Sequence, residues 1–212
     1  MEMRRRLLII VSIFCALSAT AQNMKSVFVS MPDSIAPLLT QTNKEDCIDF
    51  LDSNMKAVVK NRFGNEAEMK ALTENYVLMQ TSPVGTLEMK LLPVNDSTNV
   101  VCMVKTVCAS ACDSEVHFYA SDWSKKLDAK NFLQTPEADA FFLPNDTLTD
   151  EDALIRKKAD MHLMKVSLSK DDASLTYIYS TPDYLNEEDR EKLLPHLRKE
   201  PIVLRWQDGK FR

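Results

Sequence analysis

The stretch from Tyr76 to Tyr119 constrains the fold most, because short β-forming runs alternate there with turn-forming residues. The β-forming runs are Tyr76–Thr81, Leu87–Val94, Val100–Cys108 and Glu115–Tyr119. The connections between these runs contain Pro83, Gly85, Asn95, Asp96 and Ser110. Short runs separated by such residues are typical of consecutive antiparallel strands. The sequence therefore predicts an antiparallel meander over about 76–119.

Two of these runs also indicate which faces of the sheet are covered. Residues 100–104 are apolar at every position, as expected for a strand that is buried on both faces. Between Leu87 and Leu91, apolar residues alternate with Glu88 and Lys90. That alternation predicts a strand with one face in solvent.

An amphipathic helix over about 44–62 is predicted to cover one face of this sheet. Asn43 is its expected N-cap, and Gly64 is placed to end it. Its apolar side chains fall within one third of its circumference, and they include Cys47, Ile48, Leu51, Met55, Val58 and Val59. A shorter helical turn is expected over Glu68–Leu72.

The second half of the chain carries four further elements. They are a short helix from Thr149 to about Lys158, a hairpin over about 161–181, a helix from Glu187 to Leu194 capped by Asn186, and a last strand over about 202–207. We expect residues 22–212 to form a single α+β domain. Helix followed by strands occurs once in residues 22–121 and again in residues 149–212. A loose similarity of two halves is therefore a hypothesis, without any repeat at the level of residues.

The first 21 residues predict a secretory signal peptide that is cleaved between Ala21 and Gln22. Arg4–Arg6 gives it a basic start, residues 7–17 form an apolar core, and small residues precede the cleavage site. This core is too short to span a bilayer, which needs about 20 residues.

A lipoprotein signal is not expected, because Phe14 precedes Cys15 at a position where such signals have a small residue. No later run is long and apolar enough to predict a transmembrane segment in the mature chain. We therefore expect an exported protein of the periplasm or cell envelope.

Composition argues against two large classes of partner. The signal takes three of 26 basic and one of 31 acidic residues, which leaves 23 and 30 and a net charge near −7. Such a balance does not suit a nucleic-acid surface. The three glycines, Gly64, Gly85 and Gly209, are too few and too scattered for a phosphate-binding loop.

Cys108 and Cys112 are the expected disulfide. They flank a three-residue connection between two predicted antiparallel strands, where facing Cα atoms lie about 4.5 Å apart, close enough for a bridge. Cys47 and Cys102 lie at apolar positions, where a free cysteine is usually an inert hydrophobic residue. A redox role for Cys108 and Cys112 is the alternative, although redox pairs normally have two intervening residues.

No catalytic or metal site is predicted, and no cofactor is expected. The three histidines, His117, His162 and His196, show no spacing typical of metal ligands. Acidic clusters such as Glu187-Glu188-Asp189 lie at predicted helix starts, where the helix dipole explains them.

Aromatic residues give the one hint of recognition. Tyr119 and Trp123 bracket the end of the fourth predicted strand, and Tyr177 and Tyr179 share one face of the later hairpin. Such residues often form binding faces for carbohydrates or peptides. Packing in the core is the alternative interpretation.

Several stretches together resemble a known family. They are residues 27–34, 46–50 and 89–93, together with Asp113, Ser114, Phe118, Tyr119, Trp123, Trp206 and Gly209. The pattern resembles the domain-of-unknown-function family numbered 3256, whose members are exported proteins of Bacteroidetes. The family has no assigned activity, so the resemblance implies no catalytic residue.

The resemblance also implies a setting in which exported proteins are O-glycosylated at short motifs that begin with Asp. Such motifs occur at Asp33-Ser34-Ile35, Asp96-Ser97-Thr98 and Asp146-Thr147-Leu148. Ser34, Ser97 and Thr147 are therefore candidate glycosylation sites.

These features together favour a non-catalytic binding or accessory module of the cell envelope, with a protein or glycan as its partner. The alternative is a hydrolase or redox enzyme whose site is assembled only in the fold. An accessory protein of a larger assembly is a third hypothesis.

Overall fold

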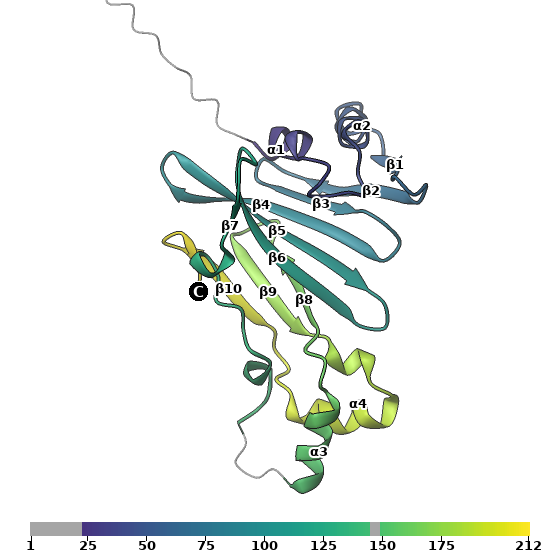
Figure 1. Cartoon of the computed structure of the whole chain (residues 1–212), viewed down its shortest axis with the longest axis vertical. Coiled ribbons are helices and arrows are strands. Elements are labelled where there is room, and N and C mark those ends of the chain that lie inside the picture. Colours follow the sequence, from purple (N-terminus) through teal and green to yellow (C-terminus); the bar gives the residue numbers. More distant parts are fainter. Residues whose placement is uncertain (1–22, 145–148) are drawn as a thin grey trace, which may run out of the picture.

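The chain folds into two antiparallel sheets with two helices on the outer face of the larger sheet (Figure 1). The computed structural model describes residues 23–144 and 149–212. The larger sheet has the strand order β1-β2-β3-β4-β5-β6-β7, which is a meander as predicted. Its strands are β1 Val58–Lys60, β2 Glu66–Leu72, β3 Tyr76–Gln80, β4 Gly85–Asn95, β5 Thr98–Cys108, β6 Cys112–Ala120 and β7 Lys126–Leu127.

The smaller sheet has the order β11-β10-β9-β8 and contains the predicted hairpin and last strand. Its strands are β8 Met164–Leu168, β9 Ser174–Tyr179, β10 Ile202–Gln207 and β11 Lys210–Phe211. The two sheets thus differ in strand number and connection. The α+β class with an antiparallel meander is confirmed, and a common origin of the two halves stays a hypothesis.

Helices occur at the start of the described chain and around the smaller sheet. The α-helices are α1 Met24–Ser30, α2 Gln41–Asp52, α3 Asp150–Lys158 and α4 Glu187–Leu193. The short 3-10 helices among the described residues are η1 Ala129–Asn131, η2 Ala138–Phe141, η3 Thr181–Tyr184 and η4 Leu194–His196. In the part of the chain that the structure describes, no helix is long and apolar enough to cross a membrane.

The predicted helix over 44–62 is wrong in its second half. Helix α2 ends at Asp52, Asn54 has a left-handed backbone with φ of 54°, and residues 58–60 form strand β1. The β-branched pair Val58-Val59 satisfies its backbone by pairing with β2. A short strand that fits the helical apolar pattern by coincidence cannot be recognised without its partner.

The start of α2 and the segment after β1 also differ from the prediction. Thr40 is the N-cap, and Asn43 completes a capping box with it as the third residue of the helix. The expected helical turn over Glu68–Leu72 lies instead in β2, which pairs with β1 and β3. Alternating burial along β2, with Ala67 and Met69 inside, explains why this segment is extended.

Two cores lie on the two faces of the larger sheet. One core packs α1 and α2 against one face, with Phe28, Cys47 and Met103 among its buried residues. The other core fills the space between the two sheets and includes Cys102 and Tyr177. Residues 100–104 are buried at every position, which confirms the prediction for this strand. The molecule therefore has three layers, with the larger sheet in the middle.

Candidate functional site

Glu88 and Lys90 lie in the interface between the sheets, so the prediction that their face of β4 meets solvent is wrong. Their exposed fractions are 8% and 2%. The smaller sheet covers this face, and the sequence of β4 alone cannot show that a second sheet packs there. Buried charges require partners, which makes this cluster the first place to look for chemistry.

Glu88 finds its partners inside the protein. Its Oε2 atom accepts a hydrogen bond from the backbone N–H of Leu168 at 2.9 Å and another from the Tyr76 hydroxyl at 3.1 Å. Burial raises the pKa of the Glu88 carboxyl, and the Leu168 N–H opposes that rise. Burial also raises the pKa of the Tyr76 hydroxyl, with the Glu88 charge adding to the effect.

The free edge of β8 explains why a carboxylate is placed there. The N–H of Met164 donates to Asp113 Oδ1 at 3.2 Å, and the N–H of Val166 donates to Ser114 Oγ at 2.9 Å. Together with Glu88, these side chains of the larger sheet satisfy three alternate N–H groups of an edge strand. Unpaired edge groups are costly when buried and invite unwanted strand pairing. The three side chains therefore have a structural role.

Lys90 binds backbone carbonyl groups in the same interface. Its ammonium donates to the carbonyl oxygens of Ser169 and Lys170, at 2.6 and 3.2 Å, in the turn between β8 and β9. Burial lowers the pKa of Lys90, while the nearby carboxylates of Asp172 and Asp171 oppose that change. Glu88 and Lys90 thus hold the smaller sheet through hydrogen bonds to its backbone. Neither side chain is left free to act as a nucleophile, an acid or a base.

Cys108 and Cys112 form a disulfide at the tip of the β5–β6 hairpin. Their sulfurs are 2.07 Å apart and their Cα atoms 4.0 Å apart. The Ser180 hydroxyl donates to the Cys112 carbonyl, so the tip contacts the chain just after β9. Cys47 and Cys102 are free and buried. Burial raises the pKa of the Cys47 thiol to about 11, with Asp46 adding to the effect, which disfavours a nucleophilic thiolate.

The histidines do not meet in a common site. His117 is half-buried, and its Nε2 lies 3.0 Å from Glu115 Oε2. Burial lowers the pKa of His117, and the hydrogen bond to Glu115 opposes that change. His162 is exposed and lies before β8. Among residues 23–144 and 149–212, no three His, Cys, Asp or Glu side chains are grouped as metal ligands.

The four aromatic candidates for a binding surface are buried, so core packing describes them, and of the four Tyr179 also lines the cavity described below. Tyr119 and Trp123 pack together with ring centroids 5.4 Å apart, and the Trp123 indole N–H donates to the Val27 carbonyl at 2.9 Å. Tyr177 and Tyr179 belong to the core between the sheets. Because both faces of the larger sheet are covered, alternation along a strand does not separate core from surface residues.

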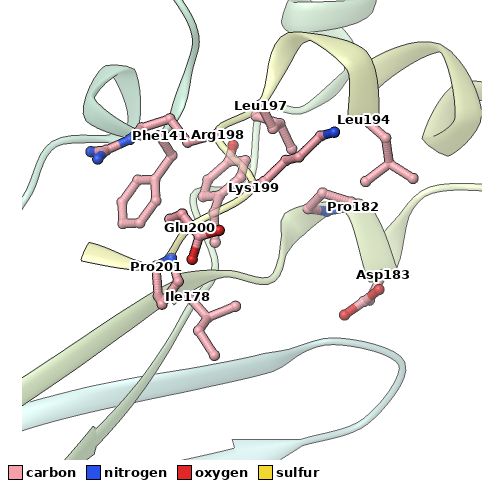
Figure 2. Close-up of a pocket in the computed structure, with 11 residues that line it drawn as sticks. Phe141, Ile178, Pro182, Asp183, Leu194, Leu197, Arg198, Lys199, Glu200 and Pro201 are labelled. Atoms are coloured by element: carbon pink, nitrogen blue, oxygen red, sulfur yellow. The ribbon is translucent and has the colours of Figure 1, made fainter. Parts of the chain in front are cut away.

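A cavity of about 480 Å³ opens at the end of the smaller sheet that lies near α4 (Figure 2). The end of β9, the 3-10 helices η2, η3 and η4, and the segment 197–201 surround it. Its lining residues are Phe141, Ile178, Tyr179, Pro182, Asp183, Leu194, Leu197, Arg198, Lys199, Glu200 and Pro201. Its volume lies in the range of ligand sites, about 300–1,000 Å³.

The cavity has an apolar interior and a charged rim. Phe141 and Tyr179 stack at its base, with ring centroids 5.5 Å apart. Ile178 and Leu194 are each 47% exposed, and Figure 2 shows them on different sides of the opening. Exposed aliphatic side chains that converge on one hollow are typical of a recognition site.

Backbone pairing fixes the shape of this cavity. The Arg198 N–H donates to the Phe141 carbonyl at 2.8 Å, and the Leu143 N–H donates to the His196 carbonyl at 2.8 Å. Asn186 caps α4 through the Asp189 N–H at 2.9 Å, as the sequence predicts. The segment after β7 is thereby joined to the segment that leads into β10.

Two other hollows are weaker candidates. One of about 270 Å³ lies between residues 35–38 and the strand ends near Gly85 and Val107. Another, of about 520 Å³, is a more open depression beside Asn75 and Asp171. Neither combines an aromatic base with half-exposed aliphatic walls, so the cavity beside β9 is the candidate functional site.

Of the residues that line this cavity, Tyr179 alone is a candidate for binding in the sequence. A further signal is Ile178, an aliphatic residue that alternates with Tyr177 and Tyr179 on the outward side of β9. The rest of the lining comes from turns and 3-10 helices that periodicity does not detect.

The remaining predicted sites are surface features or lie outside the described residues. Ser34 and Ser97 are exposed in turns, and their glycosylation stays a prediction. Ala21, Gln22 and Thr147 lie outside the described residues, so the cleavage site and the third glycosylation site are untested.

Comparison with known proteins gives a family and a fold but no activity. Residues 16–211 match the family described as "Protein of unknown function (DUF3256)". A solved structure, described as a domain of an uncharacterized protein from Porphyromonas gingivalis W83, is 30% identical with a TM-score of 0.79. The match covers 91% of this chain and 99% of that chain. No curated protein matches.

Proposed function

Because the chain belongs to the DUF3256 family of unknown function, we propose its role from the geometry: a non-catalytic module that binds a protein partner through the cavity beside β9. The observation that carries this proposal is the pair of half-exposed aliphatic residues, Ile178 and Leu194, around an aromatic base. A buried apolar anchor in such a pocket is the usual energetic centre of a protein interface.

The same geometry makes a protein partner a better candidate than a glycan. Carbohydrate binding relies on exposed aromatic faces, and the aromatic residues expected to supply them, such as Trp123 and Tyr177, are buried. The cavity walls are aliphatic residues and prolines. These surfaces suit an aliphatic or aromatic side chain of a peptide segment.

An enzyme is the weaker proposal because the buried charged groups between the sheets, Glu88 and Lys90, are occupied by structural hydrogen bonds. Glu88 and Lys90 bind backbone groups of the smaller sheet, and neither lines the cavity. Substrate turnover by the purified protein would contradict the non-catalytic assignment.

We also propose that the protein is exported to the cell envelope after cleavage between Ala21 and Gln22. The disulfide between Cys108 and Cys112 supports this location, because such bonds persist mainly in oxidising compartments. Mass spectrometry of the protein from a periplasmic fraction should give an N-terminus at Gln22. An intact N-terminus in the cytoplasmic fraction would contradict export.

The binding role is tested by photo-crosslinking in cells that produce the protein. A benzophenone amino acid is placed at Ile178 or at Leu194, and Val203 is the matched control. Val203 is 46% exposed on the same sheet but does not line the cavity. We expect the same partner adduct from both cavity positions and none from the control.

An absence of adducts at both cavity positions would contradict the proposal, and so would equal adducts at Val203. Leu194→Asp places a charge in the mouth of the cavity and should abolish the adduct formed through Ile178. Thermal unfolding of this variant, monitored by circular dichroism, separates loss of binding from loss of fold.

A further inference from the structure

The rim of the cavity carries more unpaired positive than negative charge. Asp183 is paired with Arg190, with an N–O distance of 3.2 Å. Arg198, Lys199 and Glu200 are all exposed. Within residues 23–144 and 149–212, none of these three has an ion-pair partner. The rim therefore carries two cationic side chains without an ion-pair partner, Arg198 and Lys199, and one such anionic side chain, Glu200.

The backbone of segment 197–201 places these charges around the apolar opening. The Arg198 guanidinium contacts the Ala140 carbonyl at 3.4 Å, which holds that side chain beside η2. In Figure 2, Arg198 lies on the Phe141 side of the cavity, and Leu194 and Pro182 lie on the opposite side, with Lys199 between them. The two cations thus occupy different parts of the same rim.

Unpaired exposed charges at the edge of an apolar pocket select the charge of the segment that enters it. Complementary rim charges raise the association rate and reject segments of like charge, and salt weakens both effects. A leucine flanked by carboxylates would place its side chain in the pocket and its charges near Arg198 and Lys199. Basic flanks would meet repulsion from both.

Building on the proposed function, we infer that the cavity recognises an acidic peptide segment of a partner protein, with one aliphatic anchor between carboxylate residues. The anchor packs on the Phe141–Tyr179 base between Ile178 and Leu194. The flanking carboxylates lie toward Arg198 and Lys199. The Glu200 carboxylate repels carboxylates of the segment that approach it. This repulsion sets the orientation of the bound segment.

The test uses three synthetic pentapeptides with the same central leucine. Their flanking residues are all aspartate, all serine or all lysine. Titration of isotope-labelled mature protein, followed by amide chemical shifts, gives a dissociation constant even for weak binding. We expect the aspartate peptide to bind about tenfold or more tightly than the lysine peptide at low salt. The shifts should gather at residues 178–183 and 194–201.

Charge reversal supplies the specific control. The double variant Arg198→Glu/Lys199→Glu should lose or invert the preference for the aspartate peptide. The matched variant Lys125→Glu/Lys130→Glu reverses two exposed charges outside the cavity lining and should keep it. Circular dichroism of both variants shows that they remain folded.

The outcomes separate this inference from the proposed function. Equal binding of the aspartate and serine peptides, or a preference that survives Arg198→Glu/Lys199→Glu, overturns the inference of an acidic segment. The cavity would then bind an apolar anchor whatever the charge of its flanking residues. Failure of all three peptides also overturns the inference. The proposed function is decided separately, by the photo-crosslinks at Ile178, Leu194 and Val203, whatever the peptides show.

Discussion

At the scale of single residues, Glu88 shows how a charged side chain can be buried without catalysis. Its carboxylate accepts hydrogen bonds from Leu168 and Tyr76, and the Lys165 charge further opposes the burial-driven rise in its pKa. A carboxyl whose pKa is higher in the folded state than in the unfolded state holds its proton more tightly when folded. Its stabilising contribution is therefore complete below the ordinary pKa, near 4.3, and declines as pH rises through the raised value.

Glu88→Gln tests this assignment. The amide of glutamine resembles the protonated carboxyl and does not ionise. The variant therefore lacks the loss of stability that ionisation of Glu88 causes as the pH rises. We expect the free energy of unfolding of Glu88→Gln, relative to the natural protein, to increase between about pH 4 and pH 7. Urea unfolding at several pH values measures that difference.

Glu66→Gln is the control for this series. The Glu66 side chain is 74% exposed, and its substitution should change the free energy of unfolding by less than about 0.5 kcal/mol at every pH. A flat difference between Glu88→Gln and the natural protein would show that burial does not perturb Glu88.

At the scale of elements, β8 is an edge strand whose N–H groups are bound by side chains of another sheet. Ser114 is the central contact, because its hydroxyl accepts from the Val166 N–H and lies 2.7 Å from the Thr106 hydroxyl. This arrangement joins the sheets by directional bonds in addition to apolar packing. It also blocks the edge against pairing with another chain.

Ser114→Ala should leave the Val166 N–H without a partner. We expect a loss of about 1–3 kcal/mol in the free energy of unfolding, the usual cost of an unsatisfied buried donor. The amide of Val166 should also exchange its hydrogen faster. Ser110→Ala, in the exposed tip of the hairpin, should change neither quantity. Unchanged exchange at Val166 would show that Ser114 does not hold this edge.

The disulfide is a second device at the scale of elements. It closes a very short loop at the tip of the β5–β6 hairpin, and the chain-entropy estimate gives about 2 kcal/mol. Cys108→Ser/Cys112→Ser should lower the free energy of unfolding by that amount. Reductant should lower the stability of the natural protein to the same level and leave the variant unaffected. Equal stability of the natural protein and the variant would show that the bond is dispensable for the fold.

The elements also show what the sequence can and cannot predict. The meander, the β8–β9 hairpin and the α4 cap at Asn186 follow from local turn and capping residues. The short strand β1 was mistaken for helix because Val58 and Val59 also fit a helical face. Strand β1 is defined by pairing with β2, which is information that a local pattern does not contain.

At the scale of the whole molecule, three layers decide which residues are free to act. The larger sheet is covered by helices on one side and by the smaller sheet on the other. This double cover buries Glu88 and Lys90, which alternation assigns to a solvent face, and Tyr119, which the sequence offers as part of a binding face. The candidate site instead lies at the end of the smaller sheet, where turns from distant parts of the chain meet. Such a meeting depends on tertiary packing and leaves no periodic signal in the sequence.

The central claim is that the cavity beside β9 is a binding site and the polar interface between the sheets is structural. The most direct measurement is amide hydrogen exchange over the whole chain, with and without the partner protein that photo-crosslinking at Leu194 captures. We predict slower exchange at residues 178–183 and 194–201, with no change in β4 or β5. Protection centred on Glu88 and Lys90, or on α1 and α2, would contradict the claim and move the site to another layer.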